Sequence, residues 1–223
     1  MKKVISVNPA APDPDVLSFL AGVLRKGGVI AYPTDTLYGL GANPFDRAAV
    51  DRLFKIKGRD YSKPILLLIS SLETLNPLVR DVSSFAEKII KAFWPGSLTL
   101  IFKASPSLPD LLTAGTGKIG LRLPEATLPI RLIDTIGFPL TATSANLSGA
   151  PPAKSASEIE PTLISSVDHI LDGGVCSTIP STVLDVSVDP PRLLREGKIS
   201  AATLSPWMRE EGCPEPRGRG ALR

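Results

Sequence analysis

Residues 29–41, VIAYPTDTLYGLG, and residues 54–64, FKIKGRDYSKP, decide how this chain is organised. In the first stretch an apolar run from Val29 to Ala31 predicts a buried strand. Pro33 limits that strand because proline has no N–H to donate to a ladder. Hydroxyl and carboxylate side chains follow at once, so polar groups lie at a strand end, where ligands of α/β proteins usually bind.

The second stretch closes a predicted helix and gathers positive charge. Apolar residues recur at the spacing of one helix face over residues 46–57, and Gly58 fits a left-handed cap. Lys57, Arg59 and Lys63 therefore lie together at or just beyond a helix end. Two interpretations stay open here: the cations complement the helix dipole, worth about 0.3 to 1 kcal/mol each, or they bind a polyphosphate.

Length and composition describe one folded domain. The 223 residues suffice for one large α/β domain, and 43% hydrophobic with 21% charged residues excludes a disordered chain. We expect a single domain over residues 1–211 and a flexible tail over residues 212–223. The net charge of +3 comes partly from that tail, so it gives no support to nucleic-acid binding.

Several functional classes find little support. Two cysteines far apart in sequence, Cys176 and Cys213, argue against a thiolate zinc site and a disulfide scaffold, and favour a reducing, cytoplasmic setting. No export signal or membrane-length apolar run is predicted, so we expect no membrane partner. The single histidine, His169, lies on a short apolar strand and is more typical of a core or edge residue than of a catalytic base.

Outward from the opening stretches, helices and strands alternate without the strict rhythm of a parallel sheet. The pattern predicts helices at 16–24, 46–57, 71–78, 82–93, 108–112, 128–136, 156–164 and 200–210, and strands at 29–31, 65–69, 98–102, 119–123, 139–143, 169–171, 182–186 and 192–195. An alternative for the last helix starts at Pro206 with Ser205 as its cap. We therefore predict an α/β fold with a single mixed, twisted sheet flanked by helices.

Cations and hydroxyls recur at the predicted strand ends. Arg122, in an apolar strand, must face a cleft or pair with a carboxylate, because an unpaired buried arginine is costly. The other members of the group are Thr34, Thr36, Lys57, Arg59, Lys63, Ser144, Asn146, Ser181, Thr182 and Arg195. Such a set predicts an anionic ligand, and a nucleotide first, although neither a Walker loop nor a GxGxxG motif is present. Any metal would be magnesium carried by phosphate, with Asp35 and Asp172 as candidate helpers or simple turn residues.

A series of sequence blocks carries a family resemblance. The blocks PTDTLYGLG, KGR, KPILLLI, WPGSLTLIF, GLRLP, TSANLSG, ILDGG, STVLD and REG follow in this order and cover roughly residues 16–200. Together they resemble the YrdC-like (TsaC-like) family of threonylcarbamoyl-AMP synthases, in its short single-domain form. The resemblance implies a twisted open mixed sheet with a concave basic face. It also implies a nucleotidyltransferase that makes threonylcarbamoyl-AMP and pyrophosphate from L-threonine, bicarbonate and ATP, the first step of tRNA t6A37 modification.

The same resemblance assigns site residues. ATP is expected to bind Lys57, Arg59, Lys63, Ser144, Asn146 and Arg195, and threonine to bind Thr36, Arg122 and Ser181. The catalytic set is predicted to be Lys57, Arg59, Ser144 and Asn146, with Mg²⁺ entering on ATP and no protein ligand assigned to it. The chain departs from the family at Asp60 and at residues 152–154, which affects loop contacts to ATP rather than the reaction class.

Partners and rival functions follow from the same residues. The resemblance implies the proteins that transfer t6A as partners, with tRNA as a further candidate. A non-catalytic RNA-binding module with the same fold is the alternative, although 5% aromatic residues offer few platforms for base stacking. A carbamoyl-transfer domain of the hydrogenase-maturation type shares the fold but normally accompanies cysteine-rich segments, which this sequence lacks.

Overall fold

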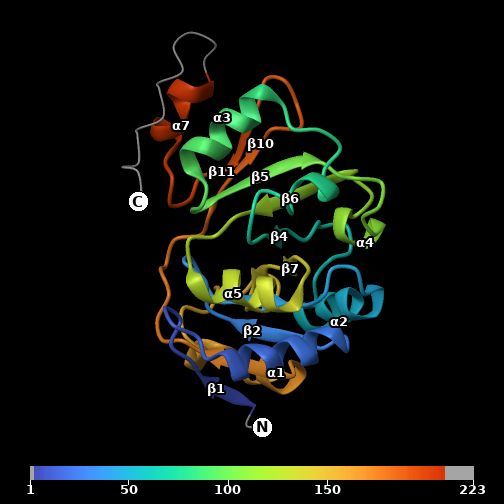
Figure 1. Cartoon of the computed structure of the whole chain (residues 1–223), viewed down its shortest axis with the longest axis vertical. Coiled ribbons are helices and arrows are strands. Elements are labelled where there is room, and N and C mark those ends of the chain that lie inside the picture. Colours follow the sequence, from blue (N-terminus) through green and yellow to red (C-terminus); the bar gives the residue numbers. More distant parts are fainter. Residues whose placement is uncertain (1–2, 209–223) are drawn as a thin grey trace.

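The computed structural model describes residues 3–208, and its strands form two mixed sheets (Figure 1). The first has the order β1–β9–β2–β3–β8, with β1 at Val4–Ser6, β9 at His169–Asp172, β2 at Ile30–Tyr32, β3 at Gly39–Gly41 and β8 at Thr143–Ser144. The second has the order β11–β10–β5–β6–β4–β7, with β11 at Arg192–Arg195, β10 at Thr182–Asp185, β5 at Leu98–Lys103, β6 at Lys118–Arg122, β4 at Leu67–Leu68 and β7 at Leu140–Thr141. The mixed α/β class is confirmed.

The expectation of a single sheet is wrong, because the structure divides the predicted strand 139–143 between two sheets. That segment leaves one sheet and enters the other: β7 pairs antiparallel with β4, and β8 pairs antiparallel with β3. Ala142 lies between them and donates its N–H to the Leu66 carbonyl at 2.9 Å. Because each half pairs with a different strand, two ladders form where the apolar pattern alone predicts one continuous strand.

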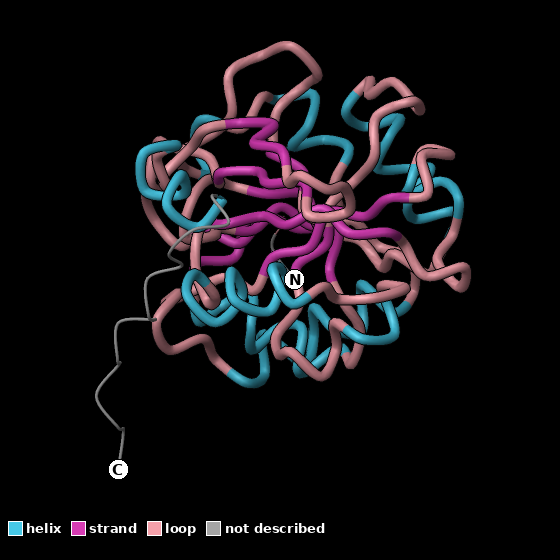
Figure 2. Tube along the Cα trace, turned by 90° about the horizontal axis from the view of Figure 1, so that it is seen from above, coloured by secondary structure: helices cyan, strands magenta, loops and turns pink. Residues whose placement is uncertain are grey.

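Helices pack on the outside of the strands, as Figure 2 shows from above. They are α1 at Pro14–Arg25, α2 at Arg47–Lys57, α3 at Ser84–Phe93, α4 at Asp110–Thr113, α5 at Thr127–Ile136, α6 at Pro161–Ser166 and α7 at Ala201–Met208. Two short 3₁₀ helices, η1 at Asn76–Leu78 and η2 at Ala156–Glu158, complete the described elements. The sequence-predicted helices at 16–24, 46–57, 82–93 and 128–136 are confirmed because each has a buried apolar face.

Prolines and local hydrogen bonds explain the other differences. The predicted helix 71–78 shrinks to η1, because Pro77 lacks the N–H that an α-helix needs. The predicted helix 156–164 becomes η2 and α6, because Pro161 holds Glu160 in an extended conformation. The predicted strand 65–69 pairs only over Leu67–Leu68, since the Ile65 N–H donates outside the ladder, to the Leu112 carbonyl. Strands β1 and β3 were not predicted.

The last helix combines both expectations for its sequence. Its start is the predicted one, because the Ser200 hydroxyl accepts a hydrogen bond from the Thr203 N–H at 3.1 Å. Pro206 lies inside α7, so the alternative start at that residue is wrong. The predicted end at Glu210 and the predicted tail 212–223 lie outside the described residues.

Two apolar clusters hold the layers together. One fills the space around β2, α1 and α5, and its largest member is Tyr32; the other extends from α2 through the second sheet to α3 and α7. Figure 1 shows α1 and α5 beside β2, and α3 and α7 beside β10 and β11. None of the described helices is long and apolar enough to cross a membrane.

Candidate functional site

A cavity of about 460 Å³ has walls from both sheets, and six of the nine predicted site residues line it. These six are Thr36, Arg59, Arg122, Ser144, Ser181 and Arg195. They come from segments as far apart as the turn before β3 and the end of β11. The fold therefore brings together strand ends that are separated by more than a hundred residues in the chain.

The turn after β2 is shaped by the hydroxyl of Thr34. This oxygen donates to the Leu37 carbonyl at 2.8 Å and accepts the N–H groups of Thr36 and Leu37 at 3.1 and 3.2 Å. It also lies 3.0 Å from the Thr36 hydroxyl, Oγ1. A hydroxyl that satisfies three backbone groups fixes the turn, so the Thr36 side chain is held at the cavity wall.

Arg122, at the end of β6, meets both conditions that the sequence left open. It lines the cavity, and its Nη1 donates to Asp35 Oδ1 and Oδ2 at 3.0 and 2.8 Å. Its Nη2 lies 3.5 Å from the Thr36 hydroxyl, and the Ser97 hydroxyl donates to Asp35 Oδ2 at 3.0 Å. Asp35 is therefore the partner of Arg122. The only signal in the sequence for this pairing was the need of a buried arginine for a carboxylate.

Ser181 and Arg195 form the opposite wall. Arg195 donates from Nε and Nη2 to the Ser181 carbonyl at 3.1 and 2.9 Å, which ties β11 to the start of β10. The Ser181 hydroxyl lies 2.9 Å from the hydroxyl of Thr99, a buried cavity-lining residue that the sequence analysis missed. Burial and the nearby charge of Arg122 lower the pKa of Arg195.

Arg59 enters the cavity from the segment that follows α2. Gly58 adopts the expected left-handed conformation, with φ at 55°, and turns the chain there. The Arg59 guanidinium then donates to the carbonyls of Lys63 and Pro64 at 3.2 and 2.7 Å. Lys63 itself is exposed and does not line the cavity, so its predicted contact with ATP stays a prediction.

Lys57 and Asn146 lie behind the cavity wall rather than on it. Lys57 Nζ donates to the Ser144 carbonyl, to the Asn146 carbonyl at 2.7 Å and to Asn146 Oδ1 at 3.4 Å. The Asn146 amide nitrogen donates to the carbonyls of Leu147 and Ala150 at 2.8 and 2.6 Å. Burial, with a smaller effect of the Arg59 charge, lowers the pKa of Lys57 to about 7. The predicted role of either residue in binding ATP stays a prediction.

The charge of the cavity selects the kind of ligand. Its charged lining residues are three arginines, Arg59, Arg122 and Arg195, and the carboxylate of Asp35, which pairs with Arg122, lies beside the lining. Hydroxyl groups of Thr36, Ser144 and Ser181 add neutral polar groups. Guanidinium groups bind carboxylate and phosphate in a bidentate manner, so the arrangement fits an anionic ligand.

The described residues offer no dense metal site. They hold no group of three or more His, Cys, Asp or Glu side chains that could surround a metal ion. Asp35 is already bonded to Arg122 and Ser97, and Asp172 Oδ1 accepts the Gly174 N–H at 3.1 Å as a turn residue. These side chains do not by themselves fit a magnesium cage, so any Mg²⁺ would depend on oxygen atoms of the ligand.

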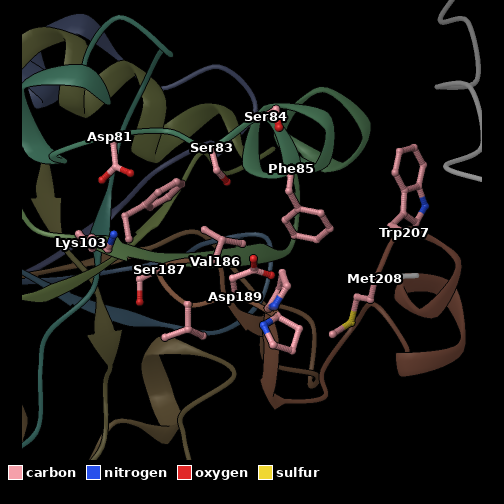
Figure 3. A pocket seen from close by; sticks show the side chains of 14 residues that line it. Asp81, Ser83, Ser84, Phe85, Lys103, Val186, Ser187, Asp189, Trp207 and Met208 are labelled. Atoms are coloured by element: carbon pink, nitrogen blue, oxygen red, sulfur yellow. The ribbon is translucent and has the colours of Figure 1, made fainter. Parts of the chain in front are cut away.

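A second cavity, of about 530 Å³, is larger but does not contain the predicted site (Figure 3). The beginning of α3, the turn between β10 and β11, and the end of α7 surround it. Figure 3 shows two carboxylates, Asp81 and Asp189, among its side chains. Since Lys103 is the one cation of its described lining, this cavity is poorly suited to a polyphosphate.

Comparisons with known proteins agree with the geometry. A family model named Sua5_yciO_yrdC, described as telomere recombination, matches residues 22–197. A threonylcarbamoyl-AMP synthase of Pyrococcus abyssi is 39% identical over 178 residues, 79% of this chain and 52% of that protein. One of Bacillus subtilis is 38% identical over 84% of this chain and 55% of that protein. The chain thus spans about half the length of these two relatives, whereas it covers 89% of a 37% identical synthase of Thiobacillus denitrificans, over 75% of this chain.

Solved structures show the same likeness. The crystal structure of P. abyssi Sua5 complexed with L-threonine has a TM-score of 0.85 and 36% identity, covering 89% of this chain and 58% of that one. Escherichia coli YciO has a TM-score of 0.82 and 31% identity, covering 89% and 97%. Two HypF structures, at 22% and 20% identity, share the fold alone. The names of the relatives do not favour the alternative of a non-catalytic RNA-binding module.

Proposed function

Because the chain belongs to the Sua5, YciO and YrdC family, we propose that it is a threonylcarbamoyl-AMP synthase. Threonine and bicarbonate form a carbamate with loss of water. A carbamate oxygen then attacks the α-phosphorus of ATP, the bond to the β-phosphate oxygen breaks, and pyrophosphate leaves. The products are threonylcarbamoyl-AMP, pyrophosphate and water, which makes the enzyme a nucleotidyltransferase.

One observation carries this proposal. A single cavity between two sheets holds three arginines and several hydroxyl donors, although their segments are distant in sequence. Two anionic substrates, a triphosphate and an amino-acid carboxylate, need such a concentration of positive charge. The reaction requires no nucleophile from the protein, so charge neutralisation and in-line positioning account for catalysis.

Threonine is assigned to the side of the cavity formed by Thr36, Arg122 and Ser181. Asp35 occupies Nη1 of Arg122, and Nη2 points along the wall toward the Thr36 hydroxyl. That second edge is the donor proposed for the carboxylate of threonine. The L-threonine complex of P. abyssi Sua5 supports threonine as the substrate.

ATP is assigned to Arg59, Ser144 and Arg195, with Lys57, Lys63 and Asn146 supporting the same region. Arg59 and Arg195 line one cavity and carry charges that no carboxylate among the described residues pairs with at salt-bridge distance. They would offset charge on the leaving pyrophosphate. Mg²⁺ would enter on the triphosphate and offset part of its negative charge, and no step is derived through it.

The product also indicates what must follow. A mixed anhydride of a carbamate and AMP is an activated acyl donor, so a transfer protein must deliver its threonylcarbamoyl group to adenosine 37 of tRNA. We propose such proteins as partners and the cytoplasm as the location. Direct contact between this chain and tRNA is a further, separate proposal.

The test is amino-acid dependence of pyrophosphate release. Purified protein is incubated with ATP, Mg²⁺, bicarbonate and single amino acids, and pyrophosphate is measured together with the adenylate product by mass spectrometry. We expect release with threonine that stops when bicarbonate is removed, and the mass of threonylcarbamoyl-AMP. Release that ignores threonine, or the absence of that mass, would contradict the proposal.

A further inference from the structure

Lys57 ends helix α2, and its side chain lies beneath the segment 144–150 rather than in the cavity. Only 2% of the residue is exposed, and its ammonium group donates to the Ser144 carbonyl and to two oxygens of Asn146. Its own carbonyl accepts the Ser148 N–H at 2.9 Å. Lys57 therefore forms hydrogen bonds with every second residue of the segment, at positions 144, 146 and 148.

Bonds within segment 144–150 close it around this lysine. The Ser144 hydroxyl donates to Asn146 Oδ1, and the Asn146 amide nitrogen donates to the Ala150 carbonyl at 2.6 Å. An ammonium has three N–H donors, and the three oxygens it faces account for all of them. In this arrangement Lys57 has no donor left for a phosphate, while Ser144 remains on the cavity wall.

No carboxylate among residues 3–208 lies at salt-bridge distance from this buried ammonium. Segment 144–150, SANLSGA, contains no ionisable side chain, and Lys55 on the same helix is exposed and paired with Asp51 at 2.7 Å. The positive charge of Arg59 lies near Lys57 and lowers its pKa by disfavouring the ammonium form. Among the described residues only neutral oxygens contact the ammonium, so no salt-bridge partner offsets its charge when it is protonated.

We propose that Lys57 is a positioning residue: it holds segment 144–150 in place from behind the cavity, and its unneutralised charge favours nucleotide binding without direct contact. The inference rests on the proposed function, because the expected nucleotide is ATP. It differs from the assignment of Lys57 as a phosphate ligand, which would leave the segment unchanged when the side chain is removed.

A dependence on pH follows from the charge. Burial lowers the pKa of Lys57 to about 7 in the free protein, and a nearby triphosphate raises that pKa by stabilising the ammonium form. Binding of ATP therefore takes up a proton above pH 7, and affinity falls as the pH rises from there. Below the free-state pKa the lysine is already charged, so this contribution is constant.

The experiment compares Lys57→Met with Lys55→Met, which makes the same substitution two residues earlier on the exposed face of α2. Hydrogen exchange of the ligand-free proteins follows the amides of Ser148 and Ala150. ATP affinity is then measured calorimetrically at pH 6, 7, 8 and 9. We expect Lys57→Met to exchange these amides at least about tenfold faster than Lys55→Met. We also expect only Lys55→Met to keep the wild-type fall in affinity above pH 7.

Each possible result of these measurements either supports or overturns the positioning role of Lys57. Equal exchange in the two variants overturns the positioning role, whatever happens to ATP affinity. Faster exchange with an unchanged pH profile leaves a purely structural lysine and also overturns the proposal. If Lys57→Met does not fold, Lys57→Gln replaces it, because it keeps N–H donors without charge: near wild-type exchange with the pH dependence lost is expected, and a retained pH dependence refutes the idea.

Different measurements test the proposed function and this inference. Wild-type protein that binds ATP but releases no threonine-dependent pyrophosphate would contradict the synthase activity. The exchange and affinity measurements on Lys57→Met would still decide the role of the lysine.

Discussion

Replacing Asp35 with asparagine tests the Arg122–Asp35 pair, which spans the chain from the first polar turn to the end of β6. The substitution keeps the size of the side chain and removes its charge. Arg122 Nη1 then loses the carboxylate that it contacts at 2.8 and 3.0 Å, and a neutral amide oxygen is its only replacement.

The magnitude follows from burial. The side chains of this pair are 4% and 10% exposed, so an uncompensated guanidinium would remain away from water. Removing one partner of a buried pair typically costs about 3 to 5 kcal/mol. The amide oxygen still accepts one hydrogen bond, which places the expected loss of unfolding free energy at about 3 kcal/mol. A domain with ordinary stability of roughly 5 to 15 kcal/mol remains folded.

The matched control is Asp168→Asn. Its carboxylate pairs with Arg52 at 2.7 Å, but the two side chains are 34% and 40% exposed, so the expected loss is at most about 1 kcal/mol. Urea unfolding of both variants is followed by tryptophan fluorescence, since Trp94 is buried. Losses that agree within about 0.5 kcal/mol, the usual error of such comparisons, would refute the argument from burial.

Three further predictions use other parts of the fold. Arg59→Ala is expected to lower kcat/KM for pyrophosphate release by about 2 to 4 kcal/mol, roughly 30- to 1,000-fold, with an unchanged urea midpoint, because it removes charge stabilisation at the leaving group; near-normal release would count against that role. Gly41→Ala is expected to cost about 1 to 3 kcal/mol of unfolding free energy, because the new Cβ would lie 2.8 Å from the Tyr32 ring, and an unchanged midpoint would show that the ring can move. Burial raises the pKa of Asp168, but bonds from Arg52 and a backbone N–H outweigh it and leave that pKa lowered. Its stabilisation is therefore present at neutral pH and lost as the pH falls through the folded-state pKa. Unfolding curves between pH 6 and 3 should show a smaller acid loss for Asp168→Asn than for wild type, and equal losses would contradict this.

Local patterns predicted the elements whose causes are local. Helix α2 begins where Asp46 accepts the N–H groups of Ala48 and Ala49, and it ends at Gly58 in the left-handed region. Both events depend on neighbouring residues, so spacing and residue type suffice to predict them. The helix predicted at 71–78 was wrong: its apolar spacing is that of a helix face, but Pro77 has no N–H to donate and only the short helix η1 forms.

The candidate site was predictable in its membership and less so in its arrangement. Polar residues at or beside element ends identified Arg59, Arg122 and Arg195, and all three line one cavity. The same reasoning grouped Lys57 with them, whereas its side chain turns away to bond with the segment 144–150. A helix end projects side chains in several directions, and only the packing of the next segment decides which way each one points.

By itself the sequence determined the α/β class, the main amphipathic helices and the concentration of cations at strand ends, because periodicity and residue chemistry act over a few neighbours. Only the tertiary structure decided that β7 and β8 divide between two sheets, that Asp35 neutralises Arg122, and that Lys57 lies behind the wall of the cavity. Each of these depends on hydrogen-bond partners about seventy residues or more away, and such partners are chosen by how whole strands and helices pack.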